Sequence, residues 1–168
     1  MMGDLSRLGL HQRESLNIIF PEVPEEYMRH FIRGCWDGDG SIYIEGRSGK
    51  LRASYVSGSE SFIKTLVQEL YKVGIHEVKP PPDKTEAEEV RLNYPDGRFP
   101  LKINEDNRAK AYYIKVDGSE NLGKLSHYFY DDVDESNYLK RKYEVFAKGL
   151  KIGEGPKDGQ LTLVLHIS

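Results

Sequence analysis

Two aspartates separated by one glycine are the residues of this sequence best suited to chemistry. Asp37 and Asp39 lie in segment 31–42, which reads FIRGCWDGDGSI. The apolar start of this segment predicts a helix that stops at Gly38 or Gly40, so both carboxylates fall at its C-terminal end. The helix dipole disfavours each anion there by about 0.3–1 kcal/mol. The pair therefore calls for a compensating cation or ligand. Since residues two apart do not share a helix face, we expect one acid to end the helix and the other to project beyond it.

The glycines of the same segment predict a second property, a helix face without side chains. Gly34 lies one turn before Gly38, so two helix backbones could approach each other closely along this face. Gly38 and Gly40 also free the backbone to bend and to expose carbonyl oxygens.

Two other interpretations of the aspartates are a plain polar loop and a calcium-binding loop. An EF-hand needs glycine at its sixth position and glutamate at its twelfth. Counted from Asp37, those positions hold Ile42 and Ser48, which excludes the EF-hand, whereas the polar loop stays open. The five histidines lack the spacing of zinc ligands, and the sequence has no glycine-rich phosphate loop.

The elements that must position the aspartates follow from periodicity. Pro24-Glu25-Glu26 opens the helix that carries them, because proline suits the first turn and acids suit the positive end of the dipole. Alternation then predicts strands at 41–45 and 51–56. An amphipathic helix follows over 59–73.

The second half of the chain predicts further strands and two helices. Segments 90–94 and 98–103 are expected as strands around a turn at 95–97, and 111–116 is a clearer strand. Helices follow from 117–120 onward and over 137–150. Because hairpins dominate the strand connections, this order predicts an α+β fold with an antiparallel sheet and its helices on one face.

The bulk properties predict one soluble, intracellular domain. The 168 residues suffice for one core, so we expect an arm over 1–23, a domain over 24–150 and a tail over 151–168 that could add a strand. No apolar run is long enough to cross a membrane, residues 1–20 lack the apolar core of a signal peptide, and the single cysteine forms no intrachain disulfide. The net charge of −3 mildly disfavours a nucleic-acid binder, but acidic patches at 83–89 and 131–135 leave a basic remainder.

Residues 32–40 resemble the motif of the LAGLIDADG homing endonucleases. They align without gaps and share glycine, aspartate, aspartate and glycine at the third, sixth, eighth and ninth motif positions. The resemblance extends over roughly 25–150 and implies an αββαββαα domain with a saddle-shaped sheet. A chain with one motif would work as a homodimer. The paired motif helices would meet through Ile32, Gly34, Cys35, Asp37 and Gly38.

The resemblance also implies a metal-dependent reaction. Asp39 would be the metal ligand, assisted by the Gly38 carbonyl, and the two copies would share Mg²⁺ ions, with Mn²⁺ or Ca²⁺ as substitutes in binding. A basic residue near the metals would hold a water or steady phosphate charge. Lys140 is the first choice for this role and Lys142 the second. Tyr55, Ser57 and Ser59 stand where some members place a polar or basic residue, and none of the three is basic.

The expected partner is double-stranded DNA with a partly palindromic site of roughly 20 base pairs. Contacts to phosphates and base edges are expected from Arg47, Lys50, Arg52, Arg91, Arg98, Lys102, Lys110 and Lys115. An RNA-splicing maturase, a DNA-binding regulator of the same fold, and an α+β domain that only dimerises through the motif helix are the alternatives.

Overall fold

The computed structural model describes residues 18–153 except 78, 80 and 95. The expectations for residues 1–17 and 154–168, which cover most of the predicted arm and tail, lie outside the described residues. Within the described part, no helix is long and apolar enough to cross a membrane.

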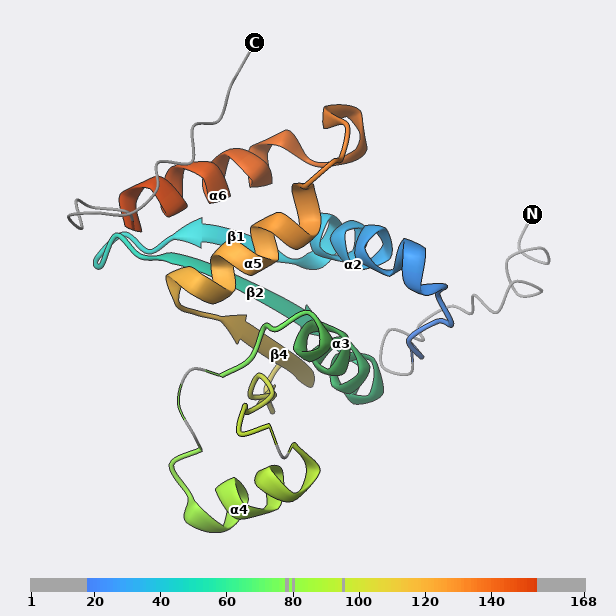
Figure 1. Ribbon diagram of the computed structural model, residues 1–168, viewed down its shortest axis with the longest axis vertical. Helices are drawn as coiled ribbons and strands as arrows, with labels where there is room; N and C mark the ends of the chain where they lie inside the picture. Colours follow the sequence, from blue (N-terminus) through green and yellow to red (C-terminus); the bar gives the residue numbers. More distant parts are fainter. Residues whose placement is uncertain (1–17, 78, 80, 95, 154–168) are drawn as a thin grey trace.

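The described residues form an α+β fold, as predicted. Its order of helices and strands is the predicted αββαββαα order with one additional helix, α4, before the third strand (Figure 1). The elements are α2 Glu25–Asp39, β1 Ser41–Ile44, β2 Leu51–Ser57, α3 Glu60–Lys72, α4 Lys84–Asn93, β3 Asn104–Asp106, β4 Ala111–Val116, α5 Ser119–Tyr130, the 3₁₀ turn η2 Glu135–Asn137 and α6 Lys140–Gly153.

The sheet has four antiparallel strands in the order β1-β2-β4-β3. Its register places the buried side chains of neighbouring strands beside one another, since Ala53 pairs with Val116 and Tyr55 pairs with Ile114. Side chains alternate along a strand, so the intervening residues belong to the other face. That face is open to solvent, where Tyr43 and Val56 are exposed.

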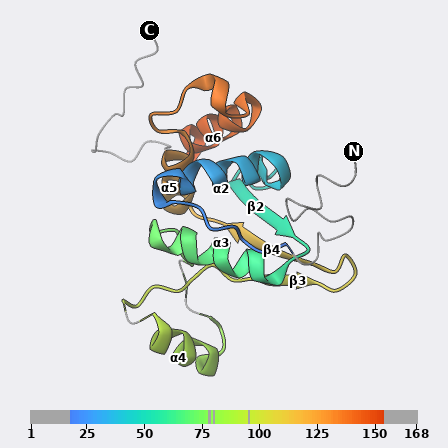
Figure 2. The same cartoon turned by 90° about the vertical axis from the view of Figure 1, so that its right-hand side faces the viewer.

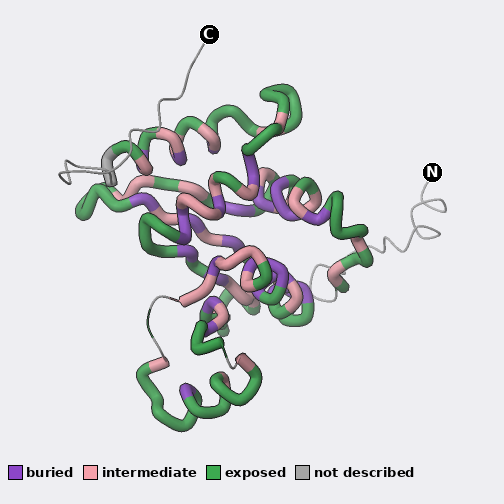
Figure 3. Tube along the Cα trace, in the orientation of Figure 1, coloured by how far each residue is buried: buried purple, intermediate pink, exposed green. Residues whose placement is uncertain are grey.

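The core lies between the buried face of the sheet and four helices. Helices α2, α3, α5 and α6 all contact β2. Ile32, Trp36, Leu66, Leu125 and Phe146 are fully buried in this layer. Figure 3 shows the buried segments gathered where these helices meet the sheet. The helices therefore cover one face, as the sequence predicted.

Helix α4 corrects the prediction of strands at 90–94 and 98–103. Asp83 is its N-cap, and the Asp83 side chain accepts a hydrogen bond of 2.9 Å from the Glu86 amide. Alanine, glutamate, leucine and arginine then continue the helix to Asn93. The segment after the turn forms only one isolated bridge, Glu77 to Phe99, before β3. Both cartoon views place α4 away from the sheet (Figures 1 and 2).

Residues on both sides of the predicted domain limits pack with or continue its elements. Phe20, expected in the arm, packs against the domain, with its ring centroid 5.2 Å from Phe31 and 5.0 Å from Phe62. At the other end, α6 runs to Gly153, so the first residues of the predicted tail belong to the last helix.

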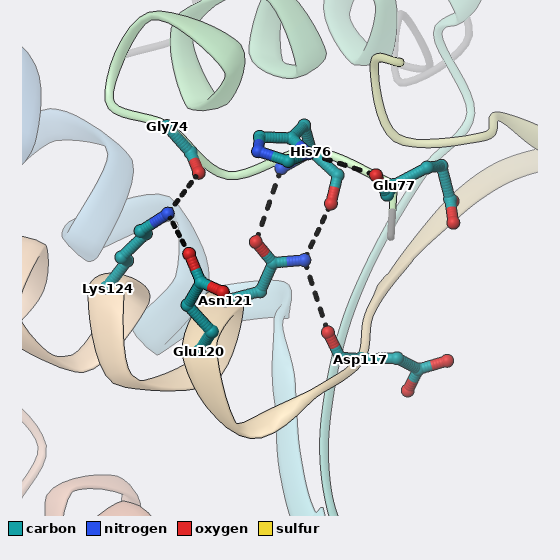
Figure 4. A network of polar contacts seen from close by, with 7 residues as sticks. All are labelled: Gly74, His76, Glu77, Asp117, Glu120, Asn121 and Lys124. Carbon is teal, nitrogen blue, oxygen red and sulfur yellow. Dashed lines mark hydrogen bonds and ion pairs between the residues drawn. The ribbon is translucent and has the colours of Figure 1, made fainter. Parts of the chain in front are cut away.

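A buried asparagine joins the loop after α3 to the start of α5 (Figure 4). The Asn121 amide donates to the carbonyls of His76 at 2.6 Å and Asp117 at 3.2 Å, and its oxygen accepts from the His76 amide at 3.4 Å. Beside it, Lys124 donates to the Gly74 carbonyl and pairs with Glu120. Since Asn121 is buried, these backbone groups have no ready replacement from water.

We expect Asn121→Ala to destabilise the fold by about 2–3 kcal/mol, because three hydrogen bonds are lost and buried backbone groups are left unpaired. Urea unfolding followed by the fluorescence of Trp36, the single tryptophan, measures this change. Asn107→Ala is the control, since Asn107 is exposed in a turn, and it should stay within about 0.5 kcal/mol of the parent. Equal stability of the two variants would contradict the role of Asn121.

Candidate active site

The end of α2 exposes one of the two aspartates. Asp39 is the last residue of the helix and is exposed, whereas Asp37 is partly buried. Gly40 ends the helix in an extended conformation, and its amide donates to the Trp36 carbonyl at 2.9 Å. A Cβ at Gly40 would overlap the Trp36 indole, so the last motif glycine is required by packing. The two acids thus differ in environment, with Asp39 at the outer end, although α2 includes both and neither projects beyond the helix.

A buried lysine provides the cation that the two aspartates require. The Lys142 ammonium donates to the carbonyls of Trp36, Asp37 and Gly40, at 2.9 Å for Asp37 and 2.6 Å for Gly40. Lysine at a helix C-terminus stabilises the carbonyls that have no partner within the helix. Burial lowers the pKa of Lys142, and the nearby Asp37 and Asp39 raise it in opposition.

Asp37 binds the residue that precedes α6, the helix that carries Lys142. Its carboxylate accepts a hydrogen bond of 3.1 Å from the Leu139 amide, immediately before α6. An anion is favoured at that end of a helix. The C-terminal end of α2 and the N-terminal end of α6 therefore each supply the charge that the other end needs.

The two candidate lysines lie in different environments. Lys140 was the first choice for the active site, but it is exposed and lies 3.9 Å from Glu135. The two lysines are two residues apart on α6 and therefore face opposite ways, with Lys142 turned into the core and Lys140 outward. Lys142 lies at the motif, with its ammonium bound to backbone carbonyls.

Two arginines of α2 were not singled out by the sequence analysis. Arg33 is buried and donates to the Phe129 carbonyl at 3.0 Å, while Arg29 donates to the Asp131 carbonyl at 2.5 Å. Both carbonyls lie at the C-terminal end of α5. The four-residue spacing of Arg29 and Arg33, which places them on one helix face, is the signal that could have identified them.

The side chains behind Asp39 are held in their neutral forms. Burial, reinforced by the charge of Asp39, raises the pKa of the Cys35 thiol to about 11. Burial also raises the pKa of Tyr55, and Cys35 and Asp39 act in the same direction. Cys35 therefore stays a thiol near neutral pH.

The described residues leave the outer face of α2 open. None of them packs within 4 Å of a Cβ built on Gly34 or Gly38, and Tyr27 is 57% exposed. Cys35 is partly exposed beside them. Ile32 does not belong to this face: its side chain is fully buried in the core of its own chain, which corrects its expected place in a dimer interface.

One chain supplies few ligands for a metal ion. The described residues contain no group of three or more His, Cys, Asp or Glu side chains that could hold a metal. Two groups at the end of α2 are candidate oxygen ligands, the Asp39 carboxylate and the Gly38 carbonyl. In the described residues, Lys142 donates to the carbonyls of Asp37 and Gly40, on either side of these groups, but not to that of Gly38. Hard oxygen donors of this kind suit Mg²⁺ or Ca²⁺, but a complete ligand shell needs oxygens from outside the chain.

The structure divides the predicted DNA-binding residues by location. On the exposed face of the sheet lie Arg52 of β2 and Lys115 of β4. The turns at its ends contribute Arg47, Lys50 and Lys110. Together these five residues remain candidates for contact with a nucleic acid.

Arg91, Arg98 and Lys102 lie elsewhere, in or after α4, because the segments that carry them are not strands. The Arg91 guanidinium lies 5.8 Å from the Phe99 ring centroid. Arg98 is paired with Asp96 at 2.6 Å and lies 5.0 Å from the centre of the Tyr71 ring. These contacts connect the α4 segment to itself and to α3, away from the exposed face of the sheet.

A comparison with known protein families finds a match that includes α2. A family model described as a LAGLIDADG-like domain matches residues 26–80. Over these residues the chain carries a LAGLIDADG-like domain. The match covers α2, β1, β2 and α3 and ends before α4. No curated protein and no solved structure matches the chain.

We expect Lys142→Met to destabilise the fold by about 3 kcal/mol, because methionine keeps the apolar stem but leaves buried carbonyls at the end of α2 without a donor. Lys140→Met removes an equal charge from the same helix and should change stability by less than about 0.5 kcal/mol. Thermal unfolding of both variants beside the parent tests this. A Lys142→Met protein as stable as Lys140→Met would show that the cap contributes nothing.

Proposed function

We propose that this chain is a homing-type endonuclease that cuts double-stranded DNA as a homodimer, with Mg²⁺ as its metal ion. The observation that carries the proposal is the open glycine face of α2 ending at the exposed Asp39. The LAGLIDADG-like domain over 26–80 supports the assignment.

The need for two copies follows from chemistry. One Asp39 carboxylate and one Gly38 carbonyl are too few oxygens for a hard cation, which takes six or more. If the glycine faces of two α2 helices meet, both helix ends come together and the number of carboxylates doubles. Phosphate oxygens of the DNA would complete the shell. A bound Mg²⁺ would supply an activated water and stabilise the leaving oxygen of the phosphodiester.

The remaining residues of the site would position Asp39 and the two helices beside it. Lys142 would hold the carbonyls of Trp36, Asp37 and Gly40 so that Asp39 stays at a fixed place beyond them. Asp37 would fix the start of α6 against α2. Neither side chain is free for proton transfer in this arrangement, since both are engaged with backbone groups.

The DNA would lie along the open face of the sheet. In a homodimer that face occurs twice, related by a two-fold axis, so the target would be partly palindromic. A positively charged rim formed by Arg47, Lys50 and Lys110 would bind phosphates. Maturase or regulator activity would appear instead as binding to RNA or DNA without cleavage.

We expect Asp39→Asn to abolish metal-dependent linearisation of a plasmid that carries the target, by at least roughly a thousandfold, while binding of the target survives. The amide keeps the shape of the side chain but removes the charge that attracts the cation. Cleavage is measured by gel electrophoresis and binding by fluorescence anisotropy in Ca²⁺.

Glu88→Gln is the control for the loss of one exposed acid, because Glu88 lies on α4 and should leave cleavage unchanged. Full cleavage by the Asp39→Asn protein would remove Asp39 from the role of metal ligand.

We expect Gly34→Ala and Gly34→Leu to weaken the dimer in that order, with loss of cleavage, because side chains would separate the paired backbones. The monomer should be equally or more stable, since a Cβ has open space there and glycine costs about 1 kcal/mol in a helix. Analytical ultracentrifugation and thermal unfolding give the two readouts. Gly123→Ala in α5, where a Cβ also has space, should leave association unchanged. An unaltered dimer in Gly34→Leu would place the interface elsewhere.

A further inference from the structure

Arg52 differs from the other basic residues at the sheet face by the carboxylates that hold it. Its Nη1 donates to Asp117 Oδ1 at 2.5 Å, and its Nη2 lies 3.6 Å from Glu45 Oε2. Glu45 in turn accepts a hydrogen bond from the Ser48 hydroxyl. The Arg52 side chain is still 29% exposed, so it is held without being buried.

The backbone that carries Asp117 is anchored in the fold. Asp117 directly follows β4, and its carbonyl accepts from the buried Asn121 of α5 (Figure 4). On the other side, Arg52 pairs in register with Tyr43 of β1. The two carboxylates therefore orient the guanidinium before any ligand arrives, which lowers the entropy lost on binding.

The local charge makes Arg52 a poor site for phosphate. With Glu45 and Asp117 it forms a group of formal charge −1, and Lys115 in the same hollow brings the total only to zero, so no net positive charge attracts a phosphate anion there. A guanidinium has five N–H donors, and in the described residues its hydrogen bond to Asp117 uses one. The others can donate to neutral acceptors, for which direction matters more than net charge.

A G·C base pair offers the matching pattern in the major groove. Guanine presents the acceptors N7 and O6, and its cytosine partner presents an N4 donor beside them. Arginine binds the two guanine acceptors as a fork, and a carboxylate accepts from cytosine N4. Arg52 next to Asp117 and Glu45 places these donors and acceptors side by side, around a hollow of about 140 Å³ lined also by Tyr43 and Lys115.

We propose that Arg52, oriented by Asp117 and Glu45, reads one G·C base pair in each half of the DNA target. This inference rests on the proposed function, since it assumes that DNA lies on the open face of the sheet. It separates Arg52, which would contact a base pair, from the other basic residues at this face, which would contact phosphates. Lys115, on the same face, forms no ion pair within the described residues and belongs to the second kind.

The experiment selects preferred sequences from a pool of random double-stranded DNA in Ca²⁺, with the wild-type chain, Arg52→Gln, Asp117→Asn and Lys115→Gln. Affinities for the selected wild-type site are then measured over a range of salt concentrations. Arg52→Gln should lose the preference for G·C at one position in each half-site and bind the wild-type site about ten- to a hundredfold more weakly, with the salt dependence unchanged. Asp117→Asn should relax the same position to a smaller extent.

Lys115→Gln should weaken binding to all sequences alike and reduce the slope of log K against log salt by about one. The inference is overturned if Arg52→Gln behaves as Lys115→Gln does, which would indicate a phosphate contact. It is equally overturned if Arg52→Gln keeps every base preference and only lowers the melting temperature, which would indicate a structural ion pair. If the wild-type chain selects no sequence at all, the proposed function fails and the inference fails with it.

Discussion

The placement of Asp39 depends on an exchange of charge between two helix ends that are about a hundred residues apart in the chain. Lys142 of α6 binds the carbonyls at the end of α2, and Asp37 of α2 binds the Leu139 amide before α6. A helix that ends in two carboxylates is unfavourable by itself. The exchange resolves this, because one acid is used to begin another helix and the buried ammonium offsets both. Asp39 is thereby left exposed at a defined position.

Side chains also bind backbone groups at both ends of α5. Arg29 and Arg33 of α2 bind carbonyls at the C-terminal end of α5. Asn121, in the first turn of α5, binds backbone groups beside the N-terminal end of that helix. Three helices thus hold one another through side chains that reach each other's unpaired backbone groups. Their apolar sides pack on the sheet through residues such as Trp36 and Phe129, so the opposite face of the sheet is left to solvent within the described residues.

Much of the fold could be predicted from periodicity, and the rest shows where local reading fails. The spacing of apolar residues located α2, β1, β2 and α3 to within about two residues, because each buries one face. Segment 83–93 was interpreted by its charge and by a proline turn, although Asp83 followed three residues later by Glu86 is a signal for the start of a helix. The choice between Lys140 and Lys142 depends on the rotation of α6 about its axis. That rotation is set by tertiary packing of Phe146 and Tyr143, which a motif alignment does not contain.

The dependence of α2 on α6 has a consequence for any rearrangement of this chain. The LAGLIDADG-like match ends at residue 80, yet the residue that secures its motif lies at 142. A shortened protein that kept the matched segment and discarded the last helix would lose the cation beneath its acids. If two copies were joined into one polypeptide, each half would have to retain its own C-terminal helix, and the linker could begin only after it.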